Sequence, residues 1–181
     1  MDRVRLGALR IRQRRGGMRV LGIDPGTAAT GYGIVEERED GLHAVRFGAI
    51  TSPATLPFAQ RLLRIYRDLR TLVTDLRPDC AAVEAVFFAR NVQSALRLGQ
   101  ARGVALLVLA EAGVGIHEYS ALEVKKAVTS FGQAQKEQVQ RMVQLLLRLP
   151  EAPQPADAAD ALAIAICHQH AVRLQDRLRM S

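Results

Sequence analysis

The sequence predicts an α/β domain built on a mixed sheet of five strands with helices on its flanks. Short runs rich in β-branched residues alternate with longer runs of helical periodicity, in the order of three strands, a helix, a strand, a helix, a strand and three helices. Strands joined by short loops pair antiparallel and strands joined through helices pair parallel, so this order predicts both pairings in one sheet. The 181 residues and 49% hydrophobic content suit one globular domain.

The first three strands are predicted to form an antiparallel meander. They cover residues 19–24, 31–36 and 43–50. The first is a short buried strand that ends at Asp24, and the Pro-Gly pair after it is a turn signal. A loop at Asp40-Gly41 joins the second and third strands, and their shortness and β-branched content favour hairpin pairing.

The later elements alternate between helices and strands until three helices close the chain. Apolar residues recur at helical spacing after Pro57, and the run after Gly103 is apolar nearly all round, which predicts a buried helix there. Ser120 and Glu123 form a capping box, so a helix starts at that serine. The predicted elements are a helix over 57–76, a strand over 80–84, a helix over about 91–112, a strand over 114–119, a helix from 120, a helix over 135–149 and a last helix from 156 to about 175.

Positive charge is concentrated at the N-terminus. The formal net charge is +7, which points to a polyanionic partner. Residues 1–17 hold six arginines and one acid, so they carry +5 and leave +2 for the remaining chain. We interpret 1–17 as a basic extension, disordered or not native, with Met18 as a candidate true start, 18–175 as a single domain and 176–181 as a C-terminal tail.

Composition and spacing argue against several classes. The longest apolar run, 103–110, is far shorter than the ~18 residues of a membrane span, and the N-terminus lacks the apolar segment of a secretory signal. Cys80 and Cys167 form no C-x-x-C pair and lie in apolar runs, so buried free thiols in a reducing cytoplasm are expected. The four histidines show no zinc-site spacing, so no structural metal of that kind is expected.

Four acidic residues stand among apolar neighbours, where an isolated charge is costly. Asp24 and Glu84 each end a predicted strand, and Asp157 and Asp160 lie three residues apart in the first turn of the last helix. If the two strands are parallel neighbours and the helix packs over their ends, the four acids converge. Carboxylate clusters suit Mg²⁺ or Mn²⁺, and two such ions about 4 Å apart can promote phosphodiester cleavage.

Each acid also has a purely structural interpretation. Asp24 before Pro-Gly is typical of a turn, and Glu84 can simply end a strand. Asp157 and Asp160 fit the N-cap and first turn of a helix, where acids face the positive end of the helix dipole. The functional interpretation therefore depends on the four acids acting together.

Four segments, in order, resemble the RuvC family of Holliday-junction resolvases. They are G-I-D-P-G-T and T-G-Y-G within 22–33, V-E-A-V-F-F-A-R-N at 83–91, S-A-L-R-L-G-Q-A-R-G at 94–103 and D-A-A-D-A-L-A-I-A-I at 157–166. The resemblance extends from Met18 to about His170. Any one motif is weak, but four of them in this order and at this spacing are highly specific.

The resemblance implies a ribonuclease-H-like fold and a homodimer that resolves four-way (Holliday) DNA junctions by paired symmetric nicks on like strands, in homologous recombination and DNA repair. It implies two Mg²⁺ ions per active site, with Mn²⁺ as an alternative. It also implies a branch-migration complex of the RuvA and RuvB type as partner, and it places the dimer interface on the helix at 91–112. No membrane association is expected.

The resemblance assigns catalytic and DNA-binding roles by position. The catalytic residues it implies are Asp24, Glu84, Asp157, Asp160, Lys125 and Lys136, with the four acids as metal ligands. Phe87 matches an aromatic residue that contacts junction bases, and base stacking is worth ~1–3 kcal/mol. The further predicted DNA contacts are Phe88, Arg90, Asn91 and Lys126, with Arg102 as another phosphate candidate. Burial in the core is the alternative for the phenylalanines, and an ordinary solvated face is the alternative for the lysines.

Two positions depart from the family pattern. Ala85 stands where a polar residue usually follows the acid, and the loop at 130–132 is less rich in glycine than usual. Both changes could alter sequence preference without affecting the metal site. Three other functions stay open: an ATPase of the actin and sugar-kinase type, which needs two such domains, a nuclease of the same fold that acts on RNA, and a non-catalytic junction binder.

Overall fold

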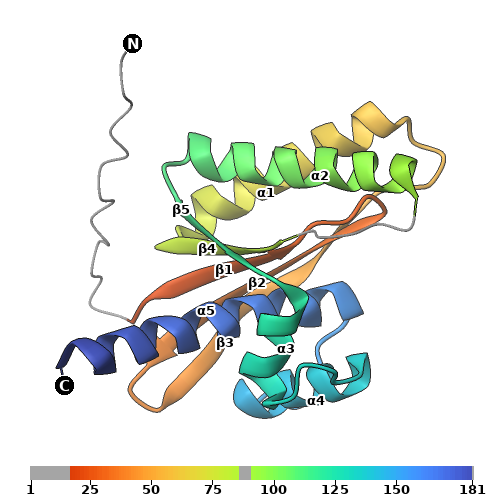
Figure 1. The fold of residues 1–181 in the computed structure, drawn as a ribbon. Coiled ribbons are helices and arrows are strands. Elements are labelled where there is room, and N and C mark those ends of the chain that lie inside the picture. The colour runs from red at the N-terminus through yellow and green to blue at the C-terminus, as the bar shows by residue number, and fades with distance from the viewer. Residues whose placement is uncertain (1–16, 86–90, 181) are drawn as a thin grey trace.

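The computed structural model describes residues 17–85 and 91–180. The strands are β1 (Arg19–Asp24), β2 (Ala29–Arg38), β3 (Gly41–Thr51), β4 (Cys80–Glu84) and β5 (Gly115–Tyr119). They form one sheet in the order β3-β2-β1-β4-β5 (Figure 1). The pairs β1–β2 and β2–β3 are antiparallel, whereas β1–β4 and β4–β5 are parallel, so the predicted mixed five-stranded sheet is confirmed.

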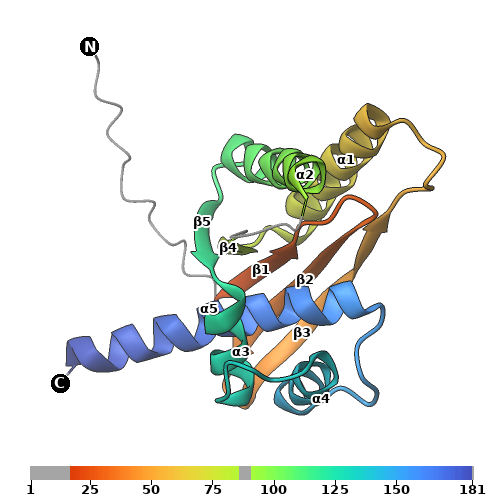
Figure 2. The ribbon, with the colours of Figure 1, turned by 45° about the vertical axis from the view of Figure 1, so that its right-hand side comes forward.

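Helices cover both faces of the sheet. They are α1 (Phe58–Leu76), α2 (Val92–Glu111), α3 (Ala121–Thr129), α4 (Lys136–Leu146) and α5 (Ala156–Met180). α1 and α2 lie on one face, while α5 crosses the other face with α3 and α4 beside it (Figures 1 and 2). Side chains alternate along a strand, so Val20 joins the core beneath α5 and Leu21 joins the core beneath α1 and α2.

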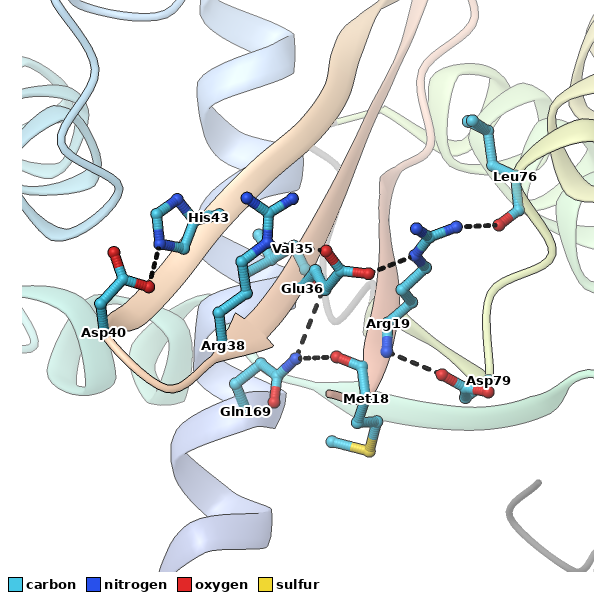
Figure 3. A network of polar contacts seen from close by, with 10 residues as sticks. All are labelled: Met18, Arg19, Val35, Glu36, Arg38, Asp40, His43, Leu76, Asp79 and Gln169. Carbon is cyan, nitrogen blue, oxygen red and sulfur yellow. Dashed lines mark hydrogen bonds and ion pairs between the residues drawn. The ribbon is translucent and has the colours of Figure 1, made fainter. Parts of the chain in front are cut away.

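A polar network ties the start of β1 to its neighbours (Figure 3). Arg19 donates from Nε to Glu36 at 2.6 Å, and Arg38 donates to the other oxygen of the same carboxylate at 2.9 Å. The backbone N–H of Arg19 also donates to Asp79, at 2.8 Å. These contacts hold together the ends of β1 and β2 that lie farthest from Asp24.

A buried glutamine attaches α5 to the same end of the sheet. Gln169 is fully buried and donates from Nε2 to the carbonyl oxygens of Met18 and Val35, at 2.8 and 3.3 Å (Figure 3). Backbone carbonyls in a core need such donors, because an unpaired buried carbonyl is costly. This contact fixes the position of α5 along the strands, and with it the position of the first turn of the helix.

The last two helices differ from the prediction in extent. α4 ends at Leu146, three residues earlier than predicted, and Arg148 adopts a positive φ of 52°, which ends helical geometry there. α5 continues to Met180, so residues 176–180 of the predicted tail are helical. Residues 1–16 lie outside the described part of the chain, and the prediction made for the N-terminal extension is untested.

The burial predicted for α2 is wrong on one side of the helix. Leu109 is fully buried against the sheet, but Leu107 is 60% exposed.

The two thiols behave as predicted: Cys80 and Cys167 are both free and buried, and burial raises the pKa of each to about 12. Within residues 17–85 and 91–180, none of the helices has the length and apolarity needed to cross a membrane.

Candidate active site

Two of the predicted acids meet where neighbouring parallel strands end. β1 and β4 pair in register, with Ile23 opposite Val83, so Asp24 and Glu84 follow at the same edge of the sheet. Residues 20–23 of β1 and 80–83 of β4 carry no polar side chain except the Cys80 thiol, and both acids that follow are only partly exposed. Parallel strands end on the same side, and for this reason residues 60 positions apart in sequence become neighbours.

Close packing of α5 brings the other two acids to this edge. A Cβ added to Gly31 would lie 2.0 Å from the carbonyl oxygen of Asp157, and one added to Gly22 would lie 1.9 Å from that of Ala161. Only glycine permits such contact between a helix backbone and a strand. The first turn of α5, with Asp157 and Asp160, therefore lies directly over the ends of β1 and β2.

The acids lie close enough to shift one another's pKa. The pKa of Asp24 is raised to about 8, mainly by burial and then by the charges of Glu84, Asp160 and Asp157. The pKa of Glu84 is also raised, by burial and by Asp160. Like charges at short range oppose ionisation, so the ionised cluster needs positive charge nearby.

Lysines from two helices provide part of that charge. Lys136, the first residue of α4, places Nζ 2.7 Å from Oδ2 of Asp160, and this hydrogen bond raises the lysine pKa. Lys125 of α3 lines the same cleft, which has a volume of about 220 Å³ and also contains Asp24, Glu84 and Asp160. The capping box at Ser120, with its hydroxyl accepting from the N–H of Glu123, sets the start of α3.

The oxygen-rich cleft fits a divalent cation. Three carboxylates, those of Asp24, Glu84 and Asp160, line the cleft, and no sulfur or imidazole is among its lining residues. The fourth acid, Asp157, is outside the lining but close enough for its charge to raise the pKa of Asp24. Hard cations such as Mg²⁺ and Mn²⁺ prefer carboxylate oxygens. The two positive charges of such a cation would relieve the repulsion that, after burial, raises the pKa of Asp24. A cation would have to compete with the Lys136–Asp160 ion pair for the Asp160 carboxylate.

The predicted DNA contacts divide into two groups. Phe87, Phe88 and Arg90 lie outside the described residues. Asn91 is the N-cap of α2, where its side-chain oxygen accepts from the N–H groups of Gln93 and Ser94 at 2.7 and 3.3 Å. Lys126 is exposed on α3 and does not line the cleft.

Two supporting contacts were not predicted from the sequence. Buried Thr30 accepts from the N–H of Gly26 and donates to its carbonyl oxygen at 2.9 Å, which closes the turn after Asp24. Arg102, predicted as a phosphate contact, donates to the carbonyl oxygen of Glu84 at 3.3 Å and pairs with Glu118 at 2.7 Å. The threonine of the T-G-Y-G motif could have predicted the Thr30–Gly26 contact. No sequence pattern indicated that Arg102 would contact the backbone of Glu84.

Comparison with known proteins agrees with this arrangement. The family model for crossover junction endodeoxyribonuclease RuvC matches residues 20–168. A crossover junction endodeoxyribonuclease RuvC from Chloroflexus aurantiacus is 54% identical over 164 residues, which is 91% of this chain and 100% of that protein. Thermus thermophilus RuvC, solved in complex with a Holliday junction substrate, matches with a TM-score of 0.82 at 36% identity, over 87% of this chain and 96% of the other.

A more distant structure shares the fold alone. The yeast mitochondrial Holliday junction resolvase has a TM-score of 0.60 at 15% identity, over 86% of this chain and 79% of that one. The close matches confirm the ribonuclease-H-like fold that the motifs implied.

Proposed function

This chain belongs to the RuvC family of crossover junction endodeoxyribonucleases, and we propose that Asp24, Glu84, Asp157 and Asp160 form its hydrolytic centre. The chain is a nuclease that resolves Holliday junctions. The observation that supports this centre best is the convergence of the four acids from β1, β4 and α5 at one sheet edge, where burial and then the charges of the other three raise the pKa of Asp24. Acids with only a turn or capping role have no reason to converge.

The acids are proposed to hold two divalent cations, Mg²⁺ or alternatively Mn²⁺. When bound, such ions supply an activated water and stabilise the leaving 3′ oxygen, which gives a 5′ phosphate. The protein contributes the arrangement of the ligands. Thr30 holds the turn after Asp24, Arg102 holds the backbone of Glu84, and the glycine-lined strands keep the first turn of α5 in place.

Lys125 and Lys136 are proposed to act on the scissile phosphate. Both line the cleft beside the acids, and they come from two different helices, α3 and α4. A lysine beside a reacting phosphate stabilises the negative charge that develops on its oxygens. We expect Lys136→Gln to lower the cleavage rate by about 10²–10³-fold, as is typical when such a donor is removed. Lys126→Gln should weaken DNA binding with less effect on the rate, because Lys126 lies outside the cleft.

Two further properties belong to this proposal. The active form is a homodimer joined through α2, where Leu96 and Leu107 are 63% and 60% exposed and leave apolar surface for a second copy. Two-fold symmetry would place one active site on each of two like strands of a four-way junction, giving paired nicks. Phe87, with Phe88, Arg90, Asn91 and Lys126, is proposed to contact the DNA at the crossover.

The biological role is proposed from membership of the RuvC family. The enzyme would act in homologous recombination and DNA repair, together with a branch-migration complex of the RuvA and RuvB type. The free thiols of Cys80 and Cys167 favour a cytoplasmic location, where thiols stay reduced.

A cleavage assay tests the proposed centre. A four-way junction and a duplex of the same sequence are incubated with the purified protein, with and without Mg²⁺, and the nicks are mapped on each strand. We expect symmetric nicks in the junction alone, dependent on the cation, and their loss in Asp24→Asn but not in Asp75→Asn, an exposed acid on α1. Junction binding without nicking would favour a non-catalytic binder, and cleavage of RNA or turnover of ATP would favour the other two alternatives.

A further inference from the structure

A second group of metal-ligating side chains lies on the α5 face of the sheet, away from the carboxylates. Cys80, His117 and His168 each place a ligand atom within 4.8 Å of the others. The two imidazole rings are stacked, with centroids 4.1 Å apart. The cysteine and His168 are buried, whereas His117 is exposed, so the group opens to solvent on one side.

The strand register explains why these residues meet. In the parallel pair β4–β5, Cys80 lies opposite Gly115 and Ala82 lies opposite His117. Residues two apart on a strand face the same way, so Cys80 and His117 both face α5, which contributes His168. The core beneath α5 contains Cys80 and is contacted by Tyr119, in agreement with this orientation.

This group is separate from the nuclease centre. On α5, His168 lies eight residues beyond Asp160, which is about 12 Å along the helix axis. On β4, Cys80 lies four residues before Glu84, or about 13 Å along the strand. The chemistry also differs, because one sulfur and two imidazole nitrogens favour a softer cation than four carboxylates do.

A neighbouring tyrosine orients one of the ligands. The Tyr119 hydroxyl oxygen and Nδ1 of His168 lie 2.7 Å apart, and in the tautomer where Nδ1–H donates to this oxygen the Nε2 lone pair is available for a cation. A hydrogen bond on the second nitrogen is the usual way in which proteins fix a metal-binding histidine. In the part of the chain that the structure describes, neither His117 nor the Cys80 thiol makes a hydrogen bond that would have to be broken.

We propose that Cys80, His117 and His168 bind a Zn²⁺ ion, with water as a fourth, exchangeable ligand. Three protein ligands from the Cys and His set are a normal complement for zinc, at about 2.3 Å to sulfur and 2.0–2.1 Å to nitrogen. Tetrahedral geometry requires the ligand atoms to lie roughly 3.3–3.8 Å apart, so atoms that now lie within 4.8 Å of one another would approach by at most about 1.5 Å. Binding deprotonates the Cys80 thiol, and the proton goes to solvent.

The ion would connect three elements at the exposed edge of the sheet. β5 is the edge strand, paired only with β4, and Cys80 and His168 belong to β4 and α5. A cation that binds the folded state and not the unfolded chain stabilises the fold in proportion to its affinity and concentration. The proposed site is therefore structural and independent of junction cleavage.

Direct metal binding tests the proposal. The full-length apoprotein is titrated with Zn²⁺ in the presence of excess Mg²⁺, and with Co²⁺ as a spectroscopic substitute. We expect one Zn²⁺ per chain, a rise of several degrees in melting temperature, and a thiolate-to-cobalt absorption band. His117→Ala should fold, because His117 is exposed, and should lower the Zn²⁺ affinity at least about 100-fold. Tyr119→Phe should lower it about 10-fold, by releasing the His168 ring.

Matched controls separate this site from others. His43→Ala removes a histidine outside the group, and Cys167→Ala removes the other buried thiol, so both should bind Zn²⁺ as the wild type does. Asp24→Asn should abolish junction cleavage and leave Zn²⁺ binding unchanged, so failure of the nuclease proposal and failure of this one give different results. Wild-type Zn²⁺ affinity in His117→Ala, or a cobalt complex without the thiolate band, would overturn the proposed site.

Discussion

Glu36 shows how a single buried charge can set the acid stability of this fold. It is only 7% exposed and accepts from Arg19 and Arg38. Burial opposes its ionisation, but the hydrogen bonds from the two arginines prevail and hold its pKa below the usual 4.5. A lowered carboxyl pKa stabilises the folded state above the unfolded-state value, and that stabilisation is lost as the pH falls through the folded-state pKa.

We therefore expect Glu36→Gln to be less stable than the wild type at pH 7, by about 1–2 kcal/mol, and to lose less stability on acidification. Urea unfolding at pH values between 7 and 3 measures both effects. Glu39→Gln is the control, because the exposed Glu39 makes no ion pair among the described residues. Equal acid sensitivity of the wild type and Glu36→Gln would contradict the role given to the Arg19–Glu36–Arg38 network.

Asp24 has the opposite effect on stability. Its pKa is raised to about 8 by burial and by the other acids. Between the ordinary value of 3.8 and about 8 the folded state binds more protons than the unfolded state, so without metal the fold loses stability as the pH rises through this range. Asp24→Asn removes this cost.

The metal-free Asp24→Asn protein should consequently melt higher than the metal-free wild type at pH 8. One pKa unit corresponds to about 1.4 kcal/mol, and about 1 kcal/mol shifts the melting temperature of a domain of this size by about 2–4 °C. Thermal melts with a chelator at pH 5 and pH 8 measure the difference, which should be larger at pH 8. A lower melting temperature in Asp24→Asn would show that the carboxylate is stabilising in the metal-free fold.

The sequence predicted those site residues that a local pattern marks. Acids that interrupt apolar runs marked Asp24, Glu84 and the pair on α5, and the structure brings these residues together. The group at Cys80, His117 and His168 was not predicted, and the absence of zinc-site spacing argued against it. Its members come from three elements and become neighbours only through strand register and helix placement, which residue spacing does not encode.

The position of α5 depends on glycines in the strands beneath it. Gly31→Ala would place a methyl group 2.0 Å from the carbonyl oxygen of Asp157, a backbone atom that cannot rotate away. We expect a loss of about 1–3 kcal/mol in unfolding free energy, as for other overpacked cores. Cleavage should fall further than stability, because the displaced turn carries Asp157 and Asp160.

Gly99→Ala provides the control for this substitution. A Cβ at Gly99 meets no other atom within 4 Å, and alanine is favoured over glycine within a helix by about 1 kcal/mol. Chemical unfolding of both variants gives the stability comparison, whereas cleavage by Gly31→Ala is compared with the wild type, because Gly99 lies on α2, the helix proposed to join the dimer. Wild-type cleavage by Gly31→Ala would show that α5 does not need this close approach to complete the active site.

The observed limits of the strands and helices show where sequence patterns were sufficient to predict them. β1 and β4 begin and end where predicted, because each contains a short apolar run that ends in an acid. α4 was predicted three residues too long, since Leu147 and Leu149 continue the apolar spacing although helical geometry has ended. The burial of α2 was overstated because an apolar pattern does not tell whether a helix face packs on its own sheet or on another molecule.

That exposed face supports a prediction for the assembled molecule. Leu107 on α2 is 60% exposed and Leu145 on α4 is 58% exposed, on opposite faces of the sheet (Figure 2). If α2 forms the dimer interface, Leu107→Asp should convert the dimer to a monomer and replace paired nicks by single nicks. Leu145→Asp should leave the dimer intact. Sedimentation velocity and strand-specific nick mapping distinguish these outcomes, and an unchanged dimer in Leu107→Asp would exclude this surface.

The charge of the whole molecule is unevenly distributed, and this bears on DNA binding. Residues 1–17 carry +5, and the remaining chain carries +2 because its basic residues are nearly matched by acids. Lys125 on α3 and Lys136 at the start of α4 line the acidic cleft, where we expect the phosphate backbone of the junction to bind. Local positive charge beside the active site, and not the net charge, is therefore expected to bind the junction.

Deletion of residues 1–17 tests which charges the junction uses. Each phosphate contact contributes about −0.9 to the slope of log K against log salt concentration, so loss of five tail contacts would reduce the slope by about 4–5. We expect the deleted protein to keep its junction binding and most of its slope, and Lys125→Gln with Lys136→Gln to reduce the slope by up to about 2. Fluorescence anisotropy over a salt series measures both. If the deletion abolished binding, the basic extension would be the main anchor, and the balanced charge of the domain would serve only the chemistry.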